Sequence, residues 1–266
     1  MFAFQLLRYM KKTVDTIIRL CIFVVIFIVM QIVASILTAS IPFGDEVGLQ
    51  RLTTYVISML LTFGALRVYD RVSAPKPMPI MVSRRGFNPV IALWGVIVLV
   101  ALSIVLNPLE RFIPADERIF DDSVWTLVNI VVVAPIFEEI LFRGKLYNML
   151  CVNISPLWSA VLSSLIFAAI HFEPIVLISG FISGMLFSYA YVRTRSIIAP
   201  IILHMGNNAL AYALTIVSYN EKSLLELVDS EAYFLIIYVV SAVIVSVAMV
   251  GVVVRLVRVR RQEPTA

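Results

Sequence analysis

The sequence predicts an all-α, polytopic membrane protein with about eight transmembrane helices around a polar intramembrane cavity. Of its 266 residues, 61% are hydrophobic and 14% are charged, and the mean hydropathy is +0.99. Soluble domains carry about 25% charged residues, so this composition excludes an ordinary soluble protein. Apolar runs near the roughly 20 residues that span hydrocarbon recur along the chain. Since no soluble stretch separates them, residues 1–266 are expected to form one integral membrane domain.

Eight apolar runs are the candidates for these helices, taken in chain order. The first is long enough to remain as a span and to exclude a cleaved signal peptide. The fifth and sixth are short and close together, so they are expected to form a tight hairpin or to be partly embedded. The runs are Thr16 to Thr38, Leu52 to Leu66, Val90 to Leu106, Val124 to Leu141, Leu157 to Ile170, Ile175 to Tyr191, Ile197 to Val217 and Tyr233 to Val254.

Basic residues set the expected orientation, because Lys and Arg accumulate in cytoplasmic loops. We place the N-terminus, the even-numbered connections and the C-terminus in the cytoplasm. Only four of the 21 basic residues then fall on the opposite side, namely Arg51, Arg111, Arg118 and Lys222. The compact chain favours a prokaryotic plasma membrane. The net charge of +4 is explained by this topology and by anionic lipid headgroups, so no nucleic-acid partner is expected.

Two adjacent acids lie inside the fourth run, at membrane depth, where ionisable residues usually have a function. Glu139 and Arg143 are four residues apart, on one helical face, so they can pair. Glu138 points about 100° away from that pair and is left to act as a general base. The alternative is an interfacial charge cluster in which Arg143 and Lys145 are ordinary cytoplasmic anchors.

The two histidines of the chain, His171 and His204, lie in the fifth and seventh runs. Phe167 precedes His171 by four residues, and Asn208 follows His204 at the same spacing, with Asn207 beside it. Imidazole and carboxamide groups on one buried face can bind water or a metal, or can face an oxyanion. The alternative is a polar link between helices. The glycines Gly180 and Gly184 of the sixth run are instead assigned to close helix packing.

These three motifs together resemble those of the CPBP intramembrane endopeptidases, also called the abortive-infection family, which include CAAX proteases and bacteriocin-processing enzymes. The resemblance covers residues 124–210, the core that carries the motifs. It implies eight membrane helices around a water-accessible cavity. The motifs are Glu138-Glu139-x-x-x-Arg143, Phe167-x-x-x-His171 and His204-x-x-x-Asn208.

The resemblance also implies roles for these residues. Glu138 would activate the hydrolytic water with help from His171, and Glu139 with Arg143 would hold the geometry. His204 and Asn208 would polarise the substrate carbonyl and stabilise the oxyanion. The substrate would be a membrane-associated or lipidated, CAAX-like peptide or protein. The oligomeric state has no signal in the sequence.

Two questions stay open at the level of sequence. A divalent metal such as zinc could be held by Glu138, His171 and His204, with water in the fourth position; a metal-free glutamate mechanism is slightly favoured. A proton-coupled transporter would also bury Glu and His, although no internal repeat is visible. A non-catalytic immunity or scaffold protein of the same family is the other alternative.

Overall fold

Each predicted apolar run corresponds to one helix in the computed structural model, which describes residues 2–73, 76–83, 89–110, 123–171, 174–218 and 230–259. The fourth run forms a composite helix from several short segments. The described part of the chain contains no strand. The other helices are α1 (Phe2–Ala39), α2 (Val47–Val72), α3 (Pro89–Glu110), α7 (Pro156–Ala169), α8 (Pro174–Thr194), α9 (Ile198–Ser218) and α11 (Glu231–Arg258).

Six helices in the described ranges are long and apolar enough to cross a membrane, which confirms a polytopic membrane protein. The two others lie around the predicted site. Helix α7 has 14 residues and is therefore about 21 Å long, short of the roughly 30 Å of hydrocarbon. Helix α9 has 21 residues and carries His204, Asn207 and Asn208. The described ranges thus contain eight helices, as predicted, of which six are long and apolar enough to be spans. The predicted shortness of the fifth run is seen in α7, but that of the sixth run is wrong, because α8 has 21 residues and is long enough to cross a membrane.

The composite helix contains two π-helical segments, in which N–H groups donate to carbonyls five residues back instead of four. The sequence did not predict these segments. The composite helix consists of α4 (Val124–Val128), η3 (Asn129–Val133), α5 (Ala134–Glu139), η4 (Ile140–Tyr147) and α6 (Asn148–Leu150), and both η segments are π-helical. The register can be followed at Pro135. The N–H of Ala134 donates to the carbonyl of Asn129, five residues back. The next carbonyl, that of Ile130, would need an N–H from Pro135, which has none.

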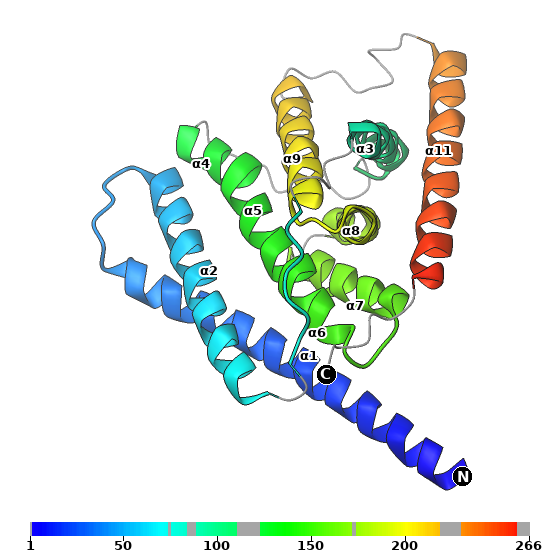
Figure 1. Cartoon of the computed structure of the whole chain (residues 1–266). Coiled ribbons are helices and arrows are strands. Elements are labelled where there is room, and N and C mark those ends of the chain that lie inside the picture. Colours follow the sequence, from blue (N-terminus) through cyan, green and yellow to red (C-terminus); the bar gives the residue numbers. More distant parts are fainter. Residues whose placement is uncertain are drawn as a thin grey trace.

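The composite helix and α9 occupy the middle of the molecule. Figure 1 shows α1 and α2 on one flank and α3 and α11 on the other, with α9 beside α5. Helices α7 and α8 pack closely against each other, as the predicted hairpin requires; of its connection, residues 172–173 lie outside the described ranges. Polar side chains of α5 therefore lie close to polar side chains of α9 at the centre of the helix bundle.

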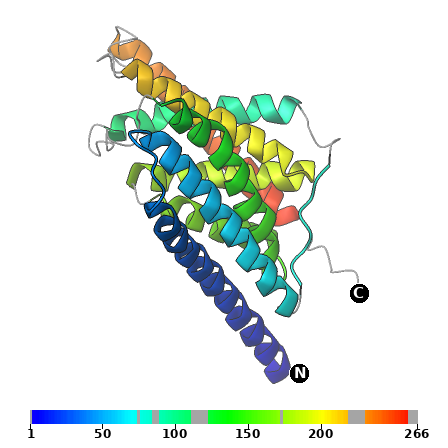
Figure 2. The same ribbon diagram turned by 90° about the vertical axis from the view of Figure 1, so that its left-hand side faces the viewer.

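The helix ends alternate between two sides of the molecule. In Figure 2 the beginning of α1, the end of α2 and the end of α11 lie toward the lower right, opposite the connection between α1 and α2 and the beginning of α11. This arrangement agrees with the predicted alternation of connections. The assignment of one side to the cytoplasm stays a prediction.

An extended segment, residues 76–83, packs along the ends of three helices (Figure 1). The N–H of Met81 donates to the hydroxyl of Tyr191 at 3.0 Å, and the N–H of Ile197 donates to the carbonyl of Met81 at 2.9 Å. Asn148 donates to the same tyrosine hydroxyl at 2.8 Å. These bonds join α6, the end of α8 and the beginning of α9, and so hold α9 in position beside the composite helix.

Candidate active site

Glu139 is the centre of a buried charge cluster. Its Oε1 atom accepts hydrogen bonds from Arg143 Nη1 at 2.8 Å and from His204 Nδ1 at 2.9 Å. Glu139 and Arg143 are 0% exposed and His204 is 3% exposed. The predicted ion pair between Glu139 and Arg143 is therefore confirmed. The structure adds His204, which arrives from α9 and joins the pair to a second helix.

Two aromatic rings and a glycine surround the guanidinium of Arg143. Its Cζ atom lies 4.5 Å from the centre of the Phe167 ring and 5.4 Å from that of Phe187, distances at which a cation is attracted to the π-face. A Cβ atom added to Gly184 would lie 2.8 Å from Arg143 Nη2 and 2.9 Å from Ser164 Cβ. The predicted packing role of Gly184 thus includes making room for Arg143.

His204 presents its two ring nitrogens to the two neighbouring acids. Nδ1 faces Glu139, and Nε2 lies 3.7 Å from Oε2 of Glu138. The ring stacks on Phe187 at 4.9 Å between centroids, which fixes its plane. When the ring is neutral, the carboxylate of Glu139 favours the tautomer with the proton on Nδ1, which leaves Nε2 as an acceptor.

Glu138 has a second contact, which the sequence analysis missed. The hydroxyl of Tyr55, on α2, donates to Oε1 of Glu138 at 3.0 Å. Glu138 is 6% exposed. It is separated from Arg143, as predicted, and its two oxygens face different partners. No local pattern marks Tyr55, since it lies 83 positions before Glu138 in the sequence.

His171 lies at the end of α7, away from this cluster. Its Nδ1 atom is 2.9 Å from the carbonyl oxygen of Phe167. The Phe167 ring stands between the two histidines, edge-on to His171 at 5.2 Å and to His204 at 5.4 Å. Among the described residues, no hydrogen bond or ion pair joins His171 to Glu138. The predicted assistance by His171 therefore stays a prediction that requires a water molecule or substrate between the two.

Asn208 is tied to the composite helix. Its Nδ2 atom donates to the carbonyl of Ile130 at 2.9 Å, the carbonyl for which Pro135 has no N–H to offer. Its Oδ1 atom accepts from Asn207 at 3.3 Å. Asn208 thus satisfies a part-buried backbone carbonyl, and its amide group has a second hydrogen that can donate to another acceptor.

Glu138 Oε2 and His204 Nε2 are close enough to share one water molecule as a hydrogen-bond partner. The 3.7 Å between Oε2 and Nε2 exceeds a direct hydrogen bond, but a water about 2.8 Å from both atoms fits this separation. Such a water would donate one hydrogen to each acceptor, so its lone pairs would point away from both. The arrangement can therefore hold a water and remove a proton from it.

The described residues do not fit a three-ligand metal site. No group of three or more His, Cys, Asp and Glu side chains within these ranges could hold a metal ion. The Nδ1 atoms of His171 and His204 face the Phe167 carbonyl and Glu139, so only the Nε2 atom of each ring could bind a metal. The set suggested from the sequence, Glu138 with the two histidines, is therefore not assembled in the described part of the chain.

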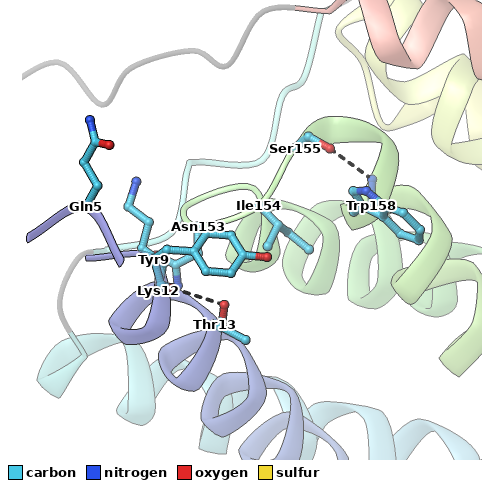
Figure 3. Close-up of a pocket in the computed structure, with 8 residues that line it drawn as sticks. All are labelled: Gln5, Tyr9, Lys12, Thr13, Asn153, Ile154, Ser155 and Trp158. Carbon is cyan, nitrogen blue, oxygen red and sulfur yellow. Dashed lines mark hydrogen bonds between the residues drawn. The ribbon is translucent and has the colours of Figure 1, made fainter. Parts of the chain in front are cut away.

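A surface hollow of about 490 Å³ lies elsewhere, between the N-terminal part of α1 and the beginning of α7. Figure 3 shows Tyr9 and Lys12 of α1 on one side of it and Ser155 and Trp158, at the beginning of α7, on the other. None of the residues of the charge cluster lines this hollow. The cavity expected around Glu138 stays a prediction.

Comparison with known proteins gives a family match over the region that carries the site. Residues 120–210 match the family model described as type II CAAX prenyl endopeptidase Rce1-like. This confirms the resemblance drawn from the three motifs, all of which lie inside the matched residues. No solved structure matches the chain significantly.

Two curated proteins illustrate the extent of the similarity. An Escherichia coli protein described as an uncharacterized 24.3 kDa protein is 33% identical over 110 residues, which cover 40% of this chain and 50% of that protein. The membrane-embedded CAAX protease MroQ of Staphylococcus aureus is 36% identical over 83 residues, or 29% of this chain and 34% of MroQ. The chain thus spans half or less of the length of these relatives.

Proposed function

We propose that this protein is an intramembrane endopeptidase that cleaves membrane-associated or lipidated, CAAX-like substrates with a water molecule activated by Glu138. The observation that carries the proposal is the 3.7 Å separation of Glu138 Oε2 and His204 Nε2, next to the buried cluster around Glu139. The family match over residues 120–210 and the similarity to a CAAX protease support the choice of reaction and substrate.

In the proposed reaction, Glu138 accepts a proton from the bound water while the water oxygen attacks the peptide carbonyl carbon. The neutral His204 accepts the other hydrogen bond of that water and so orients its lone pair. Collapse of the tetrahedral intermediate breaks the C–N bond. The proton then passes from Glu138 to the leaving nitrogen, which returns the carboxylate to its starting state.

The oxyanion needs a donor on the other side of the carbonyl. We assign this role to Asn208, through the amide hydrogen that Ile130 does not use, because one such donor contributes a large part of the rate in acyl transfer. His171 would face the substrate from the other side of the Phe167 ring than His204. Glu139 and Arg143 act through His204, since they fix the tautomer and the plane of its ring.

Cleavage by the purified protein tests the proposal. A farnesylated peptide ending in a CAAX sequence and a plain membrane-spanning peptide are incubated with the protein in liposomes, and the products are identified by mass spectrometry. Cleavage by the unmodified protein and none by Glu138→Gln is the expected result. Equal cleavage by both would overturn the proposal, and no cleavage of either peptide would favour a transporter or scaffold.

The same assay addresses metal dependence. The protein is assayed before chelation, after it, and after zinc is returned, with the metal content measured at each stage. Activity that is retained in metal-free protein is expected if Glu138 acts without a metal. Stoichiometric zinc in active protein, lost and regained together with activity, would contradict the metal-free reaction.

A further inference from the structure

Tyr55 contacts the proposed general base from outside the region that matches the family. It lies on α2, 83 residues before Glu138, and its hydroxyl donates to Oε1 of Glu138 at 3.0 Å. The family match begins at residue 120, so nothing in that match assigns a role to α2. The contact is polar and part-buried. It occurs on a helix that is long and apolar enough to cross a membrane.

The ring of Tyr55 is held in place by aromatic packing. It meets Phe137 edge-on at 6.4 Å between centroids, and Phe63, two turns further along α2, stacks on the same phenylalanine at 6.0 Å. Phe137 directly precedes Glu138 on α5. Phe137 therefore packs against the Tyr55 ring and is also the direct neighbour of Glu138 in the chain. This packing limits the movement of the Tyr55 hydroxyl and of the Glu138 carboxylate.

We infer that Tyr55 is a positioning residue of the hydrolytic site. By holding Oε1 of Glu138, it directs Oε2 toward Nε2 of His204, where the proposed water is bound. A carboxylate with one oxygen fixed has fewer orientations to lose before the proton transfer. This inference rests on the proposed hydrolysis at Glu138.

Tyr55→Phe removes the hydroxyl and keeps the ring. We expect kcat to fall about 10- to 100-fold, as for the loss of a hydrogen bond to a charged group, with KM unchanged. Tyr69→Phe is the matched control, because it removes a hydroxyl from the same helix, packed against the same core cluster, about four turns away. This control should keep full activity. An equal fall of kcat in both variants would overturn the inference.

Infrared spectroscopy tests the contact without relying on activity. Protein labelled with ¹³C-glutamate is measured as such and as Glu138→Gln, and the difference isolates the carboxylate band of Glu138. In Tyr55→Phe this band should shift in frequency, while in Tyr69→Phe it should not. An unshifted band would overturn the contact itself. A shifted band with unchanged kcat would overturn the positioning role, and an active Glu138→Gln would instead remove the proposed function beneath it.

Discussion

The Nδ1 atom of His204 lies 2.9 Å from Oε1 of Glu139, although 65 residues separate the two in sequence. The bond connects α9 to α5 at the centre of the molecule. A carboxylate that accepts from one ring nitrogen fixes which nitrogen carries the proton, so the opposite nitrogen is defined as an acceptor. Glu139 therefore determines that His204 turns an acceptor nitrogen, Nε2, toward Glu138.

Glu138→Gln should abolish hydrolysis with little loss of folded protein. The amide keeps the shape of the carboxylate and can still accept from Tyr55, but it cannot take a proton from water. Loss of general-base catalysis costs about 10²- to 10⁴-fold in rate. The measurement is kcat on the cleaved peptide, together with a thermal melt. A melting temperature far below that of the unmodified protein would indicate a structural role for Glu138.

Glu139→Gln should differ in kind, because it lowers both activity and stability. Glu139 and Arg143 are each 0% exposed, and breaking such a buried pair costs about 3–5 kcal/mol. The same change removes the charged acceptor of His204 Nδ1. Thermal unfolding and kcat are compared with those of Glu138→Gln. Unchanged stability with lost activity would mean that the cluster is not needed for folding.

Gly184→Ala should disturb the site from a helix that contributes no group to the reaction. The new methyl would lie 2.8 Å from Arg143 Nη2 and 2.9 Å from Ser164 Cβ, and such overpacking typically costs about 1–3 kcal/mol. Movement of Arg143 would also shift Glu139, so kcat should fall. Gly251→Ala is the control, since a Cβ there meets nothing within 4 Å. Equal behaviour of the two variants would contradict the close contact.

The predicted topology rests on the distribution of basic residues alone. Reporter fusions after Lys12, within residues 70–89 and after Arg261 should report the cytoplasm, whereas fusions near Asp116 and Glu226 should report the opposite side. Asp116, Glu226 and Arg261 lie outside the described residues. A cytoplasmic signal at Asp116 would contradict the eight-helix topology. It would also contradict the placement of the beginning of α1 and the end of α11 on the same side of the membrane.

Patterns within a single helix were predictable, and contacts between distant helices were less so. Eight apolar runs gave the helices, and a spacing of four residues gave the pair of Glu139 and Arg143. Tyr55 was missed because a tyrosine in an apolar run is common and carries no signal of its partner. His171 was expected near Glu138, but the direction of α7 places Phe167 between the histidines.

The π-helical segments were hidden for a different reason. The fourth apolar run was predicted as one continuous span over residues 124–141, and hydropathy does not report which carbonyl each N–H reaches. Pro135 was the available signal, since it removes a donor from the middle of a helix. Its consequence appears only in three dimensions, where Asn208 supplies the missing donor to Ile130.

This arrangement allows the two roles of Asn208 to be separated. Asn208→Ala should lower kcat about 10²- to 10³-fold if the residue donates to the oxyanion. It should also destabilise the protein by removing the donor to the part-buried Ile130 carbonyl. Pro135→Ala restores an N–H five residues after Ile130. The double variant Pro135→Ala with Asn208→Ala should therefore recover thermal stability but not kcat. Recovery of both would assign Asn208 a purely structural role, and recovery of neither would show that the π register at η3 does not depend on Pro135.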